Sequence, residues 1–272
     1  MDEILTDLSE TALVRAIRQS LCDIGWSLRP WWKQAVFEEH EKLNRWWSPM
    51  PFGLYFNAVV SKREPEGEET DLIRETVEFF RSRSRVDFDW RLTPGLENGD
   101  WGRQLEASGF RFHQGTPGMA VDLKRLPEAI PVPDNTKITR VESAGEMRVW
   151  AKTFTLGYEL PEDWEAPLLD TMLASLHGSM QSFLAWIGDQ PVAASTVFYS
   201  AGVAGIYNVA TLKAWRGKGL GAAVTLQPLL DARAKGVRAG ILQSSELGYQ
   251  VYQRLGFKEL CRMNYYTWQE RE

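Results

Sequence analysis

The chain has 272 residues, 44% of them hydrophobic and 25% charged, which is typical of a folded globular protein and excludes wholesale disorder. The formal net charge of −5 argues against nucleic-acid binding, because nucleic-acid-binding proteins usually present a basic surface. Two cysteines and three histidines, all far apart, argue against a disulfide framework and a histidine-built metal centre, so we expect no metal.

Neither a membrane span nor a secretory signal is expected. No apolar run approaches the roughly 18 residues that cross a bilayer. Residues 1–20 carry early acids and lack the basic start and apolar core of a secretory signal. We therefore expect a cytoplasmic protein, a monomer or homodimer, that binds no membrane.

The N-terminal half predicts a mixture of strands and helices. Residues 54–60 and 86–92 are typical of strands, and residues 71–84 between them are typical of a helix. A further helix ends within LEASGF (105–110), where a glycine precedes a phenylalanine, and residues 117–123 predict a closing strand.

Three prolines in ten residues mark PEAIPVPDNT (127–136) as the clearest linker, between an N-terminal domain at 1–126 and a C-terminal domain at 137–272. The polar stretch SKREPEGEET (61–70) is interpreted as a surface loop. The segment between Trp32 and Trp46 looks helical, and the many tryptophans predict core or pocket walls rather than a base-stacking surface.

The C-terminal half predicts a longer alternation of elements. Helices are expected at 143–156, 165–177, 219–235 and 246–255, and strands at 182–188, 192–200, 205–211, 239–245 and 257–268. Its later part repeats the order of the N-terminal half, which suggests two related units.

The strongest motif is RGKGLG (216–221), placed between a strand and a helix. Alternate glycines let the backbone approach a ligand and direct successive N–H groups into one concavity. The helix that follows adds its positive dipole end. Six basic residues and one acid lie between Lys213 and Arg238. These features predict a pyrophosphate cradle, with a plain strand–helix turn as the alternative.

Other phosphate-binding loops fit the motif less well. A Walker A loop is excluded because the Gly-Lys pair is followed by Gly219 rather than by Ser or Thr. A dinucleotide fingerprint is matched by Gly217, Gly219 and Ala222, but it comes late in the chain, after antiparallel-looking strands. The N-terminal half has the acidic REPEGEE (63–69) at the corresponding place, which predicts no polyphosphate site there.

The pattern R-x-x-G-x-G from Arg216 to Gly221, followed by YQRLGF (252–257), resembles the motifs of the GCN5-related N-acetyltransferase (GNAT) superfamily over roughly residues 137–268. The N-terminal half resembles a degenerate copy, so the whole is similar to a tandem GNAT protein. The resemblance implies an α/β fold of two GNAT-like units, each a mixed, mostly antiparallel twisted sheet flanked by helices. The C-terminal unit would be catalytic and the N-terminal unit a scaffold.

The resemblance also implies acetyl coenzyme A as donor and direct transfer to a primary amine of a small molecule. Backbone N–H groups of the glycine-rich loop would hold the pyrophosphate, and the strand before it would pair with the pantetheine arm and face the thioester oxygen. The residues so assigned to the cofactor are Val209, Ala210, Thr211, Arg216, Gly217, Lys218, Gly219, Leu220, Gly221, Ala222, Ser244 and Ser245. Ser244 and Ser245 stand where the family often has an asparagine.

Tyr252 takes the position of the family's general acid, which protonates the leaving thiolate, and core packing is its alternative role. The family's base position holds Tyr207 and Asn208, neither of which is a carboxylate. Glu246 is the candidate base. The substitutes are Glu159, Glu162, Asp163 and His177. A non-catalytic acyl-CoA-binding regulatory module, or acetylation of a protein amine, stays open as an alternative function.

Overall fold

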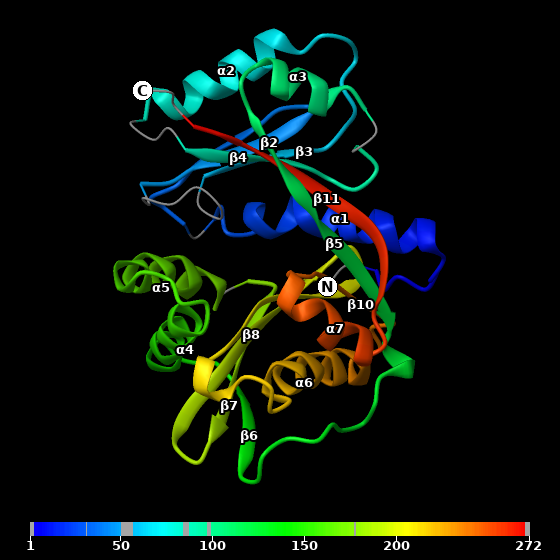
Figure 1. Cartoon of the computed structure of the whole chain (residues 1–272), viewed down its shortest axis with the longest axis vertical. Coiled ribbons are helices and arrows are strands. Elements are labelled where there is room, and N and C mark those ends of the chain that lie inside the picture. The colour runs from blue at the N-terminus through cyan, green and yellow to red at the C-terminus, as the bar shows by residue number, and fades with distance from the viewer. Residues whose placement is uncertain are drawn as a thin grey trace. The chain divides into compact units, whose positions relative to one another are not determined.

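The computed structural model describes residues 3–30, 32–49, 57–83, 87–96, 99–176 and 178–269. The chain forms two compact units (Figure 1). Unit 1 consists of Met1–Ser20 and Met119–Leu260, and unit 2 consists of Leu21–Gly118 and Cys261–Glu272. Three elements contribute residues to both units: α1 (Glu10–Trp26), β5 (Arg111–Asp122) and β11 (Lys258–Trp268).

Unit 1 has an open sheet in which the order β5-β10-β9-β8-β7-β6 is hydrogen-bonded. Its elements are β6 (Thr136–Arg140), α4 (Ala144–Gly157), α5 (Glu165–Ser175), β7 (Met180–Ile187), β8 (Gln190–Ser200), β9 (Val203–Thr211), α6 (Leu220–Ala234), β10 (Ala239–Gln243) and α7 (Glu246–Arg254). Strands β6 to β9 are antiparallel, and β10 runs parallel to β9 after the crossover through α6.

Unit 2 has the order β1-β2-β3-β4-β11-β5. Its own elements are β1 (Val36–Glu39), β2 (Leu43–Trp47), β3 (Ala58–Ser61), α2 (Thr70–Arg81), β4 (Phe88–Leu92) and α3 (Trp101–Ala107). Strands β1 to β3 are antiparallel, and β4 runs parallel to β3 after α2. Both units therefore share the sequence of three antiparallel strands, a helix, a parallel strand and a helix.

The division into units differs from the boundary predicted at 127–136. Met119–Asp122, at the end of β5, belongs to unit 1, while Cys261–Trp268, in β11, belongs to unit 2. Each half of the chain thus supplies the end of its last strand to the sheet of the other half. A composition shift along the chain carries no signal for such an exchange, because it depends on strand pairing between distant segments.

The predicted mixed α/β class with a mostly antiparallel sheet is confirmed. The prediction of a helix between Trp32 and Trp46 is wrong. This segment forms the β1–β2 hairpin, in which Phe37 lies opposite Trp46 and stacks on it at 6.3 Å. The contact of the half-buried Phe37 with the buried Trp46 favours the strand conformation. The sequence analysis also missed α1 and β6. No helix of the described residues is long and apolar enough to cross a bilayer.

The helices of unit 1 cover both faces of its sheet. One core joins residues of α6 and α7 to β7, β8 and β9, and includes Val224, Tyr252 and Ile206. The other joins α4 and α5 to the same strands, through Trp150 and Ala210 among others. The end of β9 therefore lies between two packed layers.

The connection from β9 to α6 depends on two left-handed glycines. Gly217 has φ +76° and Gly219 has φ +81°. A Cβ at Gly217 would meet nothing within 4 Å, whereas a Cβ at Gly219 would collide with the carbonyl oxygen of Pro131. The segment predicted as a linker therefore packs against the glycine-rich loop.

Alanine substitution separates these two constraints. Gly217→Ala should cost about 1–2 kcal/mol of folding stability, because an L-residue is strained at positive φ. Gly219→Ala carries the same strain plus the collision, and should cost a further ~1–3 kcal/mol. Thermal or denaturant unfolding measures both. Equal losses would show that the Pro131 contact imposes no constraint.

Candidate active site

The predicted pantetheine strand, Val209–Thr211, begins within a β-bulge of β9. Thr196 lies opposite Tyr207, but Ala194 lies opposite Ala210, so Asn208 and Val209 together face Ser195. Asn208 has φ +54°. A bulge of this kind turns a peptide group out of the ladder. On the other side of the sheet, the carbonyl oxygen of Ser195 accepts a 3.0 Å hydrogen bond from Nε1 of the buried Trp150.

Strands β9 and β10 separate after Ile206, just before the bulge. Within the described residues, the parallel ladder between them covers Ala204 to Ile206, whereas β9 stays paired with β8 as far as Thr211. The last residues of β9 therefore present a backbone edge that an extended ligand could pair with.

The glycine-rich loop follows this edge directly. Gly217 and Lys218 are exposed, and Gly219 is the N-cap of α6 with no side-chain hydrogen bond to the helix. The first N–H groups of α6 thus lack a side-chain cap, which suits an anion. Leu220 is 1% exposed and packs in the core, so it can serve a ligand only through its backbone. Gly221 and Ala222 are half-buried in the first turn.

The two basic side chains of the loop, Arg216 and Lys218, make different contacts. Lys218 Nζ lies 4.5 Å from the ring centroid of Trp215. Arg216 is turned back toward the protein, where Nη2 donates to the carbonyl oxygen of Gly157 at 2.7 Å and Nε donates to that of Thr211 at 3.2 Å. Arg216, predicted as a cofactor residue, therefore binds the ends of α4 and β9.

Tyr252 lies in α7 and is 8% exposed. Burial raises the pKa of its phenol to about 12, and a hydrogen bond with Thr225 opposes this only partly. The Thr225 hydroxyl donates to the carbonyl oxygen of Gly221 at 2.9 Å, so Tyr252 is connected to the first turn of α6. The phenol keeps its proton at neutral pH. Tyr252 packs in the core beside α6, and its role as general acid stays a prediction.

The segment after β10 uses its hydroxyls locally. Ser245 caps α7 by accepting from the N–H of Gly248 at 3.2 Å, and Ser244 donates to the carbonyl oxygen of Ser245 at 2.8 Å. Glu246 is exposed in the first turn of α7. The sequence analysis missed Gln243, whose Nε2 is buried without a hydrogen-bond partner among the described residues. The signal available in the sequence was the polar Gln243 at the end of the otherwise apolar strand β10.

The candidate bases are not brought together. The Tyr207 hydroxyl shares a 2.9 Å hydrogen bond with Ser20. Lys213 and Arg216 hold the pKa of Glu159 below its usual value, which makes it a weaker base. Glu162 and Asp163 are exposed in a short 3-10 turn, and His177 lies outside the described residues.

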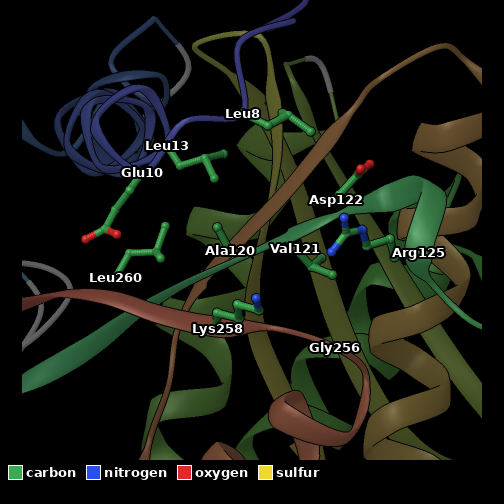
Figure 2. Close-up of a pocket in the computed structure, with 10 residues that line it drawn as sticks. All are labelled: Leu8, Glu10, Leu13, Ala120, Val121, Asp122, Arg125, Gly256, Lys258 and Leu260. Carbon is green, nitrogen blue, oxygen red and sulfur yellow. The ribbon is translucent and has the colours of Figure 1, made fainter.

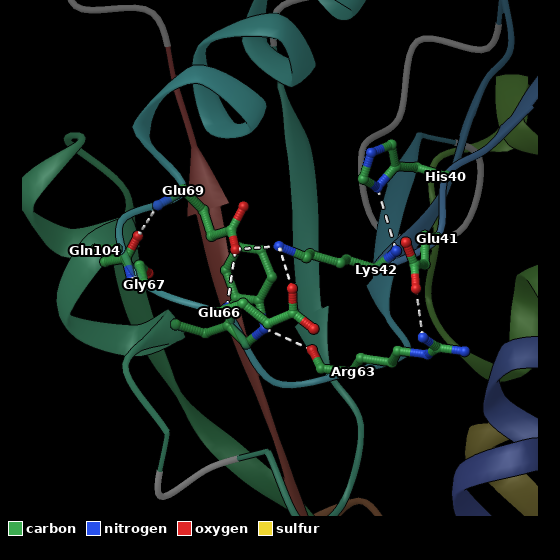
Figure 3. A network of polar contacts seen from close by, with 9 residues as sticks. His40, Glu41, Lys42, Arg63, Glu66, Gly67, Glu69 and Gln104 are labelled. Carbon is green, nitrogen blue, oxygen red and sulfur yellow. Dashed lines mark hydrogen bonds and ion pairs between the residues drawn. The ribbon is translucent and has the colours of Figure 1, made fainter.

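Unit 2 has a different arrangement before its own crossover helix, α2 (Figure 3). Glu69 accepts a 2.6 Å bond from Lys42 Nζ and a 3.0 Å bond from the N–H of Glu66. Burial raises the pKa of Glu69, but these bonds outweigh it, so the net shift is downward. Gln104 of α3 holds the same loop by donating to the carbonyl oxygen of Gly67 and accepting from the N–H of Glu69. Carboxylates and a paired lysine thus occupy the place where unit 1 has glycines.

Unit 1 contains a cavity of about 260 Å³, and Figure 2 shows the side chains that line it. Its lining comes from the N-terminal segment, β5, β11 and their neighbours, and shares none of the predicted site residues that the structure describes. In the described part of the chain, no three His, Cys, Asp or Glu side chains form a group that could hold a metal ion.

Comparisons with known proteins agree with this fold. Residues 138–241 match the acetyltransferase (GNAT) domain family. Curated protein sequences contain no match. Among solved structures, a GCN5-related N-acetyltransferase from Kribbella flavida is 17% identical with a TM-score of 0.70, over 92% of this chain and 96% of that one. One from Sphaerobacter thermophilus is 18% identical with a TM-score of 0.61, over 97% and 93%. A tandem GNAT protein from the clavulanic acid biosynthesis pathway is 13% identical with a TM-score of 0.62, over 97% and 95%.

The structural likenesses establish the fold, and the family match adds the type of domain. The resemblance inferred from Arg216–Gly221 and residues 252–257 is thereby confirmed, and the family suggests acyl-CoA-dependent acetyl transfer. Over residues 138–241, this chain is similar to the acetyltransferase (GNAT) domain family.

Proposed function

We propose that this protein is an acetyl-CoA-dependent N-acetyltransferase that acts on a primary amine of a small molecule. The observation that carries the proposal is the continuity of the β9 backbone edge, beyond Ile206, with the uncapped N-terminus of α6. One surface offers an edge for amide pairing and the other offers donors for phosphate oxygens. An acyl-CoA requires both, in that order.

The residues of the chain divide the work of binding. The N–H groups of Gly217 to Gly221 would hold the pyrophosphate, with Lys218 and Lys213 adding positive charge near it. The edge of Val209–Thr211 would pair with the pantetheine amides. A peptide N–H turned out of the ladder at Asn208 would stabilise the charge that develops on the thioester oxygen. Acetyl-CoA itself supplies the activated acetyl group.

Tyr252 would assist departure of the coenzyme A thiol. Its pKa of about 12 is well above that of an ordinary thiol, which is about 8.5. Full proton transfer from the phenol to a thiolate would therefore run uphill. The phenol would act mainly by hydrogen bonding to the sulfur as charge builds up, which places its contribution near the lower end of general acid catalysis, about 10²-fold.

The family's usual base position holds Tyr207 and Asn208, neither of which is a carboxylate. Glu159, a substitute candidate for the base, is held in ion pairs with Lys213 and Arg216. An acceptor amine that arrives neutral needs no strong base, and its proton would pass to water or to Glu246. This favours a small amine of low basicity. The structural neighbour from the clavulanic acid biosynthesis pathway supports small-molecule chemistry for this architecture.

Unit 2 would be a degenerate GNAT-like scaffold that holds no cofactor of its own. Its order of elements repeats that of unit 1, and the Glu66–Glu69 loop fills its corresponding site with carboxylates. These would repel a polyphosphate. We propose a cytoplasmic monomer or homodimer for the protein as a whole.

Titration calorimetry should find one acetyl-CoA bound per chain, because among the described residues the glycine-rich cradle lies in unit 1 and the corresponding loop of unit 2 carries carboxylates. Incubation with a panel of primary amines should then release free thiol from acetyl-CoA in proportion to acetylated amine. Two cofactors per chain would contradict the scaffold role of unit 2. Binding without turnover on any amine, small or peptidic, would favour the acyl-CoA-binding module.

Replacing Tyr252 by Phe should lower turnover by about 10²-fold with the KM for acetyl-CoA little changed. The ring keeps its packing against Phe257, 6.0 Å between centroids, so the fold should persist. Phe257→Leu is a control for the packing alone and should leave turnover near that of the parent. A loss under about fivefold in Tyr252→Phe would assign Tyr252 to the core.

A further inference from the structure

Glu159 occupies a backbone position that normally belongs to glycine. After the last residue of α4, Gly157, the N–H of Leu160 donates to Thr155 at 3.0 Å and that of Glu159 to Leu156 at 3.2 Å. These are the two bonds of a Schellman helix end, whose left-handed residue is usually glycine. Glu159 holds this position with φ +55°. A strained residue at such a place indicates a role for its side chain.

The Glu159 carboxylate binds the two cations that precede the glycines. Oε1 lies 2.9 Å from Nη1 of Arg216, and Oε2 lies 3.2 Å from Nζ of Lys213. Arg216 carries the contact onward, since its other nitrogens bind the carbonyl oxygens of Gly157 and Thr211. One guanidinium thus joins the end of α4, the end of β9 and the start of the loop.

The left-handed conformation aims this carboxylate at the loop. Gly157 packs so closely on β9 that a Cβ there would lie 2.9 Å from the Cβ of Ala210. The chain turns back at Glu159 directly beside the end of the predicted pantetheine strand. An exposed ion pair is worth little for stability. Its effect here lies in fixing where the loop begins.

We infer that Glu159 is a positioning residue, which holds Arg216 across the ends of α4 and β9 and so preorganises the N–H groups of Gly217–Gly219 for the coenzyme A pyrophosphate. This rests on the proposed function. Preorganisation raises affinity because the loop loses less conformational freedom on binding. Arg216 then serves the cofactor indirectly, by bracing the loop, and Lys213 is held at its entrance.

The substitution Glu159→Gly tests this, because it moves stability and affinity in different directions. Glycine relieves the left-handed strain, so the Tm should equal that of the parent or exceed it by about 3 °C. Without the carboxylate, Arg216 and the loop are less restrained, so the Kd for coenzyme A should rise by about fivefold. Glu159→Asn, which also tolerates the left-handed region, should weaken binding in the same way. Asp170→Asn removes an exposed carboxylate of α5 and should leave the Kd unchanged.

Amide hydrogen exchange of residues 213–220 in the cofactor-free protein gives a second readout. Exchange should be faster in Glu159→Gly than in the parent. Unchanged or tighter binding of coenzyme A by Glu159→Gly would overturn the inference, tighter binding because the carboxylate then only repels the polyanion. A fall in Tm of Glu159→Gly together with its loss of affinity would also overturn the inference, because the weaker binding would then follow from a damaged fold. If the parent itself binds no coenzyme A, the proposed function fails, while hydrogen exchange still decides the role of Glu159.

Discussion

The bulge in β9 is the constraint on which the rest of unit 1 depends. By adding a residue opposite Ser195, it lets β9 remain paired with β8 while its other edge leaves β10 after Ile206. The carbonyl oxygen of Ser195 accepts a hydrogen bond from the indole of Trp150 in α4, and this indole is fully buried. A buried carbonyl without a partner would be costly, so this bond makes the bulge compatible with a packed core.

Left-handed backbone conformations occur in the bulge of β9, at the end of α4 and in the glycine-rich loop, but the residue types that adopt them differ. Gly217 and Gly219 accept it without strain, and at Gly219 the Pro131 carbonyl also excludes a side chain. Asn208 and Glu159 adopt it with a side chain attached. Asparagine tolerates this region, whereas glutamate does not favour it. The glycines therefore allow the tight turn before α6, and Glu159 places a charge beside it.

The electrostatics of the site favour anion binding more than proton abstraction. Cations and backbone donors gather around the start of α6, and the nearby carboxylate of Glu159 has its pKa lowered by two of those cations. The phenol of Tyr252 is kept protonated by burial. Such a site would suit a polyphosphate and a leaving group that accepts a hydrogen bond, but it would offer little basicity to an acceptor. The proposed reaction would therefore require an amine that arrives neutral.

Local patterns in the sequence determined much of this picture. The glycines of RGKGLG, the helix end at Gly256 and the nearly all-apolar strand predicted at 239–245 are features of adjacent residues. Local features of this kind predicted the domain type and most elements of unit 1. The tertiary structure decided what those patterns could not contain. Arg216 bonds to Gly157, Trp150 bonds to Ser195, and β5 and β11 each end in the other half's sheet. These contacts join residues far apart in the chain, and nothing in the neighbourhood of either partner specifies the other. For that reason the sequence predicted Arg216 as a cofactor residue and Glu159 as a substitute base, but only the fold showed that they bind each other.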